Sequence, residues 1–129
     1  MTINHLFLMV PSIHASTLRT FYRQALRPLS YTELIVASET YIGYGSDYPY
    51  FWLKPYASNA STAAPVPTHI AFDAPSQPAV DEFYKAALEA GGTDNGAPGI
   101  RTEYGRQPYY AAYVKDVLGN NIEAVHVPK

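Results

Sequence analysis

The chain has 129 residues, of which 47% are hydrophobic and 14% aromatic, enough for one packed domain or two small halves sharing a core. Its net charge is −2 without a run of basic residues, so the charge pattern does not support nucleic-acid binding. No apolar run reaches the roughly 18 residues that cross a bilayer, and no signal peptide is visible. Because cysteine is absent, disulfides and thiolate chemistry are excluded. We expect a soluble, cytoplasmic protein with no membrane partner.

The first half of the chain is predicted to form a strand, a helix and three further strands. The first strand covers Ile3–Val10, and the helix runs from about residues 14–16 to Leu26, before Arg27-Pro28. Turn residues separate three later strands at about Leu29–Ala37, Tyr41–Gly45 and Tyr50–Lys54. Residues 55–67 are rich in Ala, Ser and Pro and are predicted to be a linker.

The second half begins the same series again. We expect a strand over Thr68–Ala74 and a helix from the N-cap Ser76 to Gly91-Gly92. Thr93–Gly99 is predicted to be a loop. Three short strands are expected to follow, at about Ile100–Tyr104, Tyr109–Lys115 and Asn121–Val127.

The two halves are related by an internal repeat. Asn4–Ser12 is echoed by Thr68–Ser76, which aligns His5 with His69, 64 positions later. The apolar residues of the two helices repeat as well, with the i, i+3, i+4, i+7, i+8 spacing of one buried face. The chain is therefore predicted to be a single α+β domain, 1–129, of two βαβββ modules, at about 1–54 and 68–127.

Strand alternation selects candidate ligands. The residues expected to face the helices are Leu6, Leu8 and Val10 in the first strand, Ile70 and Phe72 in the fifth, and Ile122 and Ala124 in the last. His5, His69 and Glu123 then point to the opposite, concave side. A single strand histidine is more often a surface or hydrogen-bonded residue. Two at equivalent positions with one carboxylate, however, make the ligand set of a facial triad, which leaves coordination positions open.

Several segments resemble the vicinal oxygen chelate superfamily, which includes glyoxalase I, bleomycin- and fosfomycin-resistance proteins and extradiol dioxygenases. They are Asn4-His5-Leu6, the Phe21-Tyr22 helix, Thr68–Phe72, Asp94–Gly99 and Tyr109–Val125. The resemblance covers nearly the whole chain outside the linker. It implies paired βαβββ modules that curl into a half-open barrel around a divalent metal ion, often across a homodimer. The implied ligands are His5, His69 and Glu123, holding Fe(II), Mn(II), Ni(II) or Zn(II).

The resemblance also suggests the residues around the metal. Tyr113 matches a position that faces the site in fosfomycin-resistance relatives, so it is either a catalytic or substrate contact or an ordinary packing residue. Phe7 and Trp52 would shape an apolar pocket. Arg101 and Arg106 either meet an anionic group of the substrate at the rim or are solvated surface charges.

The chain differs from known members of the superfamily at several positions, and these differences narrow the activities that we expect. Glyoxalase I needs a carboxylate in the strand symmetric to the last one, and Tyr50–Lys54 contains none, which argues against glyoxalase I activity. Fosfomycin-resistance relatives carry threonine where this chain has Phe7. No named activity is matched fully.

Three functions remain open at this stage. The first is a metal-dependent lyase, isomerase or dioxygenase whose small-molecule substrate chelates the metal through adjacent oxygens. The second is a non-catalytic binding protein of the bleomycin-resistance type that takes an aromatic small molecule. The third is a structural partner with a degenerate site.

A homodimer is expected because open sheet edges need cover. The sequence leaves open whether the modules pair within one chain or exchange between two. In the exchanged case we expect His69 from one chain, with His5 and Glu123 from the other.

Overall fold

The structure is a computed structural model that describes residues 2–129. Module 1 consists of β1 (Leu6–Pro11), α1 (Ala15–Ala25), β2 (Thr32–Val36), β3 (Ile42–Gly45) and β4 (Phe51–Tyr56), with short 3₁₀ turns η1 (Ser12–His14) and η2 (Arg27–Leu29). Module 2 consists of β5 (His69–Asp73), α2 (Gln77–Glu89), β6 (Thr93–Ile100), β7 (Tyr110–Lys115) and β8 (Asn121–His126). The βαβββ order thus occurs twice, which confirms the predicted α+β fold.

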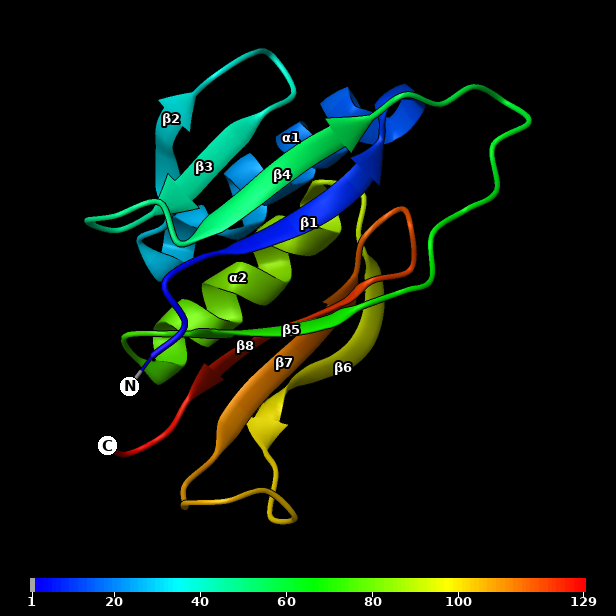
Figure 1. Ribbon diagram of the computed structural model, residues 1–129. Helices are drawn as coiled ribbons and strands as arrows, with labels where there is room; N and C mark the ends of the chain where they lie inside the picture. Colours follow the sequence, from blue (N-terminus) through cyan, green and yellow to red (C-terminus); the bar gives the residue numbers. More distant parts are fainter. Residues whose placement is uncertain (1) are drawn as a thin grey trace.

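Each module forms one four-stranded mixed sheet. The strand orders are β1-β4-β3-β2 and β5-β8-β7-β6, so the two sheets have the same topology. The outer pairs β1–β4 and β5–β8 are parallel, and the other pairs are antiparallel. Both helices lie on one side of the sheets (Figure 1). We call the other side the open face.

The predicted alternation is confirmed for Leu8 and Val10 of β1 and for Ile70 and Phe72 of β5, but Leu6, which was expected on the same buried side, is 41% exposed at the start of β1. In β1, Leu8 and Val10 are 7% and 0% exposed, whereas Phe7 and Met9 are 37% and 45% exposed on the open face. The buried helix residues follow the predicted spacing: Leu18, Phe21, Tyr22 and Ala25 in α1, and Val80, Phe83 and Ala87 in α2. The Ser76 side chain caps α2 by accepting a hydrogen bond from the amide of Ala79 at 3.2 Å.

The modules are joined through the side that carries the helices. The helices α1 and α2 pack against each other, and the rings of Phe51 and Phe72 meet edge to face at 5.2 Å between centroids. The hydroxyl of Tyr22 donates to Asp116 Oδ2 at 2.5 Å. Both of these residues are buried, so this hydrogen bond links the first helix to the last turn of module 2.

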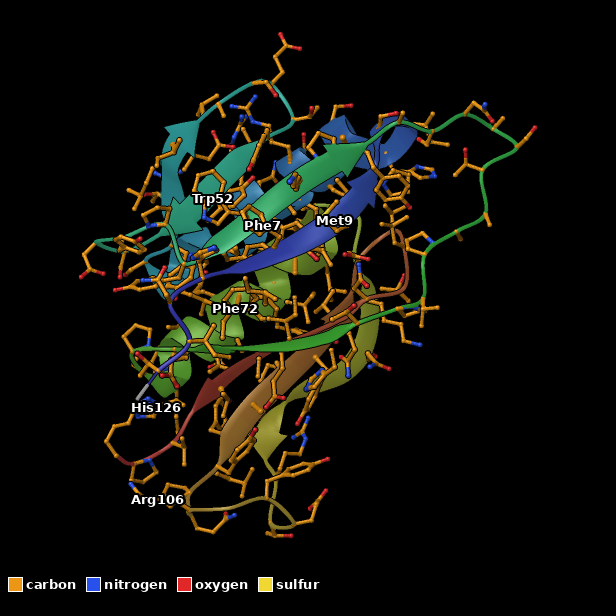
Figure 2. The ribbon with its side chains drawn as sticks, in the orientation of Figure 1. Phe7, Met9, Trp52, Phe72, Arg106 and His126 are labelled. Carbon is orange, nitrogen blue, oxygen red and sulfur yellow. The ribbon has the colours of Figure 1, made fainter. Side chains whose placement is uncertain are left out.

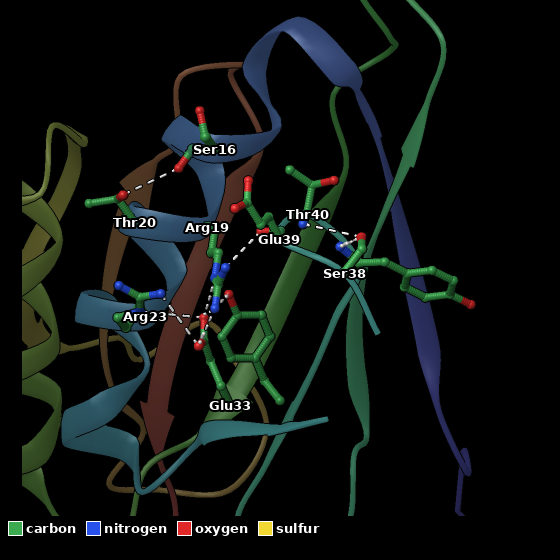
Figure 3. Close-up of polar contacts among 10 residues, drawn as sticks. Ser16, Arg19, Thr20, Arg23, Glu33, Ser38, Glu39 and Thr40 are labelled. Carbon is green, nitrogen blue, oxygen red and sulfur yellow. Dashed lines mark hydrogen bonds and ion pairs between the residues drawn. The ribbon is translucent and has the colours of Figure 1, made fainter. Parts of the chain in front are cut away.

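An ion cluster fixes α1 to the edge of its own sheet (Figure 3). Arg19 donates from Nε to Glu33 Oε2 at 2.9 Å and from Nη2 to Oε1 at 3.0 Å. Arg23 contacts the same carboxylate at 3.4 Å. The two-pronged contact orients Glu33 firmly, since the guanidinium matches the carboxylate geometry.

The sequence prediction is wrong for β6. The expected loop Thr93–Gly99 is the strand itself, and the expected strand Ile100–Tyr104 falls largely in the loop that follows. Pairing with β7 holds this Gly- and Pro-containing segment extended, with two register shifts around Gly96, whose φ is 152°. Among residues 2–129, neither helix has the length and apolar character that a bilayer crossing needs.

Candidate metal centre

His69 and Glu123 meet on the open face of module 2. They come from β5 and β8, which lie side by side with Ala71 opposite Glu123 in register. His69 Nε2 is 3.1 Å from Glu123 Oε1. The carboxylate is only 3% exposed, whereas the imidazole is half exposed. The parallel pairing of β5 with β8 therefore creates this pair.

A backbone contact fixes the proton arrangement of His69. Its Nδ1 lies 2.9 Å from the carbonyl oxygen of Asn121, and because that oxygen can only accept, Nδ1 carries a hydrogen. Nε2 then presents either a lone pair or a second proton to Glu123. A hydrogen held by either atom, or a metal ion bound by both, would make this contact favourable. Metal-bound histidines use the same anchor on the second nitrogen.

Tyr109 completes the surroundings of the carboxylate. Its hydroxyl donates to Glu123 Oε2 at 2.5 Å. Burial, and then the hydrogen bond to Glu123, raise the pKa of the phenol, so it remains a donor. The sequence analysis missed Tyr109, although the alternation of Tyr109, Ala111 and Tyr113 would have placed it on the open face.

Tyr113 and Arg101 lie next to the pair. Tyr113 is directly opposite Glu123 in register, and its ring centroid is 6.3 Å from that of His69. Burial, and then the charge of Glu123, raise the pKa of Tyr113 to about 12. The Arg101 guanidinium lies over the Tyr113 ring at 5.3 Å and donates to the carbonyl of Ala97 at 2.6 Å. No carboxylate in residues 2–129 forms an ion pair with it.

Arg106 lies elsewhere. It is exposed on the loop between β6 and β7, at the far end of module 2 (Figure 2). No side-chain contact in the described chain brings it to Glu123 or His69.

His5 is prepared for a ligand role but lies apart from the pair. Its Nδ1 is 2.7 Å from Asn4 Oδ1, the residue is exposed, and Nε2 has no hydrogen-bond partner within residues 2–129. Its ring meets Phe7 edge to face at 5.3 Å. In both candidate histidines, therefore, an amide oxygen binds Nδ1 and leaves Nε2 for a ligand contact.

The strands β1 and β5 run in opposite directions across the middle of the molecule (Figure 1). One groove is lined by Ile3 and Leu6 together with Asp73, and another by Met9 together with Thr68. Leu6, the residue after His5, lines both grooves together with Ile70, the residue after His69. In residues 2–129, no three His, Asp or Glu side chains gather as metal ligands.

The two-ligand pair fits a divalent ion in its donor types, its locked imidazole and its buried carboxylate. On the same strand face, Asn121 Oδ1 is buried and has no hydrogen-bond partner in the described chain. A third protein ligand is missing from the single chain. For an exchanged dimer, the sequence predicts that one chain supplies His69 and the other supplies His5 and Glu123. This prediction is wrong, because β5 and β8 share one sheet, which keeps His69 and Glu123 in the same chain. In such a dimer His5 would be the residue contributed by the other copy.

Module 1 carries different side chains at the equivalent positions. Trp52 pairs with Phe7 as Glu123 pairs with Ala71, so Trp52 takes the position of the carboxylate. Gly43 pairs with Trp52 and thus takes the position of Tyr113. A Cβ at Gly43 would approach the indole to 2.9 Å, so glycine makes room for the ring.

The sequence matches no family model and no curated protein. The fold matches solved structures over nearly their whole length. A glyoxalase/bleomycin resistance protein from Albidiferax ferrireducens T118 is 26% identical, with 95% of this chain and 97% of that chain covered and a TM-score of 0.69. A glyoxalase/bleomycin resistance protein/dioxygenase family enzyme from Burkholderia phytofirmans PsJN is 19% identical, with 99% and 100% covered and a TM-score of 0.69.

A third match, lactoylglutathione lyase from Agrobacterium tumefaciens, is 16% identical, with 97% of this chain and 92% of that chain covered and a TM-score of 0.63. Together with the paired βαβββ modules, the full-length matches define the class of the protein. The chain belongs to the glyoxalase/bleomycin resistance/dioxygenase superfamily, which is also called the vicinal oxygen chelate superfamily.

Proposed function

We propose that the protein is a divalent-metal-dependent enzyme whose metal site is completed between two copies of the chain. His69 and Glu123 of one copy, with His5 of the other, would hold Fe(II), Mn(II), Ni(II) or Zn(II). Such an ion acts as a Lewis acid on two adjacent oxygens of a small substrate. The observation that carries the proposal is the contact of the locked imidazole of His69 with the buried carboxylate of Glu123.

The remaining residues have distinct roles in this proposal. Tyr109 holds Oε2 of Glu123, so that Oε1 alone is directed toward His69. Arg101, without a carboxylate partner in the described chain, would bind an anionic group of the substrate, and Tyr113 would orient that group. Histidine and carboxylate side chains bind a metal ion in their deprotonated forms, so metal binding at His69 and Glu123 should weaken at low pH.

The second candidate is a binding protein of the bleomycin-resistance type without catalysis. The observation in its favour is the set of aromatic side chains on the open face of module 1, where Phe7, Tyr41 and Trp52 lie within 6.3 Å of one another. Retention of the His69–Glu123 pair favours the enzyme, because a metal-free binder has no need of ligands in this geometry.

Mixing two inactive variants tests the assembly. The variants His5→Ala and His69→Ala should each lose metal, measured by elemental analysis after purification without chelator. A dimer containing one chain of each, isolated with two affinity tags, pairs the intact His5 of one chain with the intact His69 of the other. We expect this mixed dimer to bind one metal ion per two chains.

The matched control is His126→Ala, because the Nδ1 of His126 contacts the carbonyl of Ala74 and the residue lies outside the pair. It should keep the full metal content. A mixed dimer without metal would refute the shared site. Metal retained by His69→Ala would refute the role of the pair.

A further inference from the structure

We infer that the open face of module 1 is a binding site for a planar aromatic carboxylate. Its residues are Phe7, Tyr41, Trp52 and Lys54, which we call the aromatic platform. The inference deepens the proposed function, because it names the substrate class, and it rests on that function only in placing the bound molecule beside the metal.

The platform is built from two neighbouring strands, β1 with Phe7 and β4 with Trp52 and Lys54, and from Tyr41, the residue before β3. The ring centroids of Phe7 and Trp52 are 5.8 Å apart, those of Tyr41 and Trp52 are 5.5 Å apart, and those of Phe7 and Tyr41 are 6.3 Å apart. Phe7 remains 37% exposed, and the other two rings are half-buried. Phe7 and Trp52 lie on the side turned away from α1 (Figure 2). A flat ring can add to this cluster in the same stacked or edge-on geometries.

The indole is held in place by its surroundings. Trp52 donates from Nε1 to the carbonyl of Pro49 at 2.9 Å, so its one polar atom already has a partner within the chain. Its ring covers Gly43, where any side chain would push it off the sheet. An anchored aromatic ring loses little conformational entropy on binding, which suits it as a platform for a ligand.

Lys54 supplies the charge preference. Its ammonium group is 5.4 Å from the Phe7 ring centroid and 5.9 Å from that of Tyr41. No carboxylate in residues 2–129 pairs with it. A cation at the rim of an aromatic cluster favours a ring that bears a negative group, because the ring stacks while the carboxylate meets the ammonium.

The platform also adjoins a candidate metal ligand. The His5 ring contacts Phe7 edge to face at 5.3 Å, so a molecule on Phe7 lies next to the imidazole of His5. Oxygens on the far side of such a molecule would be directed toward the site that His5 helps to form. The carboxylate class thus follows from Lys54, and the aromatic class from the three rings.

The single tryptophan of the chain makes this site directly observable. The metal-free full-length protein is titrated with 4-nitrobenzoate, which quenches indole fluorescence. We expect saturable quenching that benzoate reverses and cyclohexanecarboxylate does not. Lys54→Gln should weaken 4-nitrobenzoate binding at least about tenfold while leaving the neutral 4-nitrobenzyl alcohol unaffected. The matched control is Lys115→Gln, an exposed lysine on β7, which should bind as the wild type does.

Linear, non-saturable quenching would overturn the inference, as would equal losses in the two lysine variants. A blue-shifted emission that no probe quenches would also overturn it, because it would mean that a second copy of the chain covers the platform. The same titration in His69→Ala separates this inference from the metal proposal. Saturable quenching there supports the platform even if metal binding fails, and metal binding without quenching removes the platform alone.

Discussion

Trp52 and Glu123 occupy the same register position in two sheets of the same topology. In module 2 the carboxylate is buried and held by Tyr109 and His69. In module 1 the indole lies over Gly43 and adjoins two other aromatic rings. The repeat therefore preserves the backbone while the chemistry of the two halves differs. One half presents a histidine and a buried carboxylate on its open face, and the other presents a cluster of aromatic rings.

The largest expected effect comes from changing Glu123, the residue of module 2 that is equivalent to Trp52 in module 1. Glu123→Gln should lower the affinity for Zn(II) by at least about 100-fold, since even the loss of an outer contact to a metal ligand costs 10- to 100-fold. Trp52→Gln changes the equivalent residue of module 1 and should stay within about threefold, because the indole is no ligand. Competition with a chromophoric chelator measures both. Equal losses would show that the two modules are not specialised.

Tyr109→Phe tests what holds the carboxylate. The variant leaves Oε2 of the buried Glu123 without its donor, so the metal-free protein should lose about 2 kcal/mol of unfolding free energy, measured with urea at pH 7. Tyr104→Phe is the control, because Tyr104 is 47% exposed. An unchanged stability in Tyr109→Phe would mean that Glu123 is satisfied in another way.

The smallest effect concerns the ion cluster that joins α1 to β2 in module 1. Module 2 has no equivalent, because within residues 2–129 no ion pair joins α2 to β6. The hydrogen bond from Arg19 lowers the pKa of Glu33 below its ordinary 4.5, with partial burial opposing. A depressed pKa stabilises the fold above the ordinary value, and this stabilisation is lost as pH falls through the lowered value.

Glu33→Gln should therefore cost about 1 kcal/mol at neutral pH and remove part of the stability loss between about pH 5 and 3. Urea unfolding at several pH values measures this difference. The exposed Glu82→Gln on α2 should follow the wild type throughout. If the two variants behave alike, the cluster contributes nothing measurable.

Much of this fold could be predicted because the pattern that specifies it is local. The alternation of β1 and the helix spacing placed Leu8 and Val10 inside and Phe7 outside, as found. The strand β6 could not be predicted, since Thr93–Gly99 has the composition of a loop and is extended only through its pairing with β7.

The candidate site, like the fold, could be predicted from the sequence only in part. The side chains of His69 and Glu123 were selected by alternation alone, and the pairing of adjacent strands brings them together. His5 satisfies the same alternation but belongs to the other module, and within residues 2–129 it does not join the pair as a third ligand. No local pattern encodes how two modules are oriented, or whether a second copy supplies the missing ligand.

The contacts that join the two modules would also allow the modules to follow each other in the reverse order along the chain. Tyr22 with Asp116, Phe51 with Phe72 and helix against helix connect the halves without the segment between β4 and β5. Meanwhile Thr2 and Lys129 both lie near Asp73, at the same end of the molecule. A circular permutant that joins the present ends and opens new ones between Tyr56 and His69 would retain every buried contact named above.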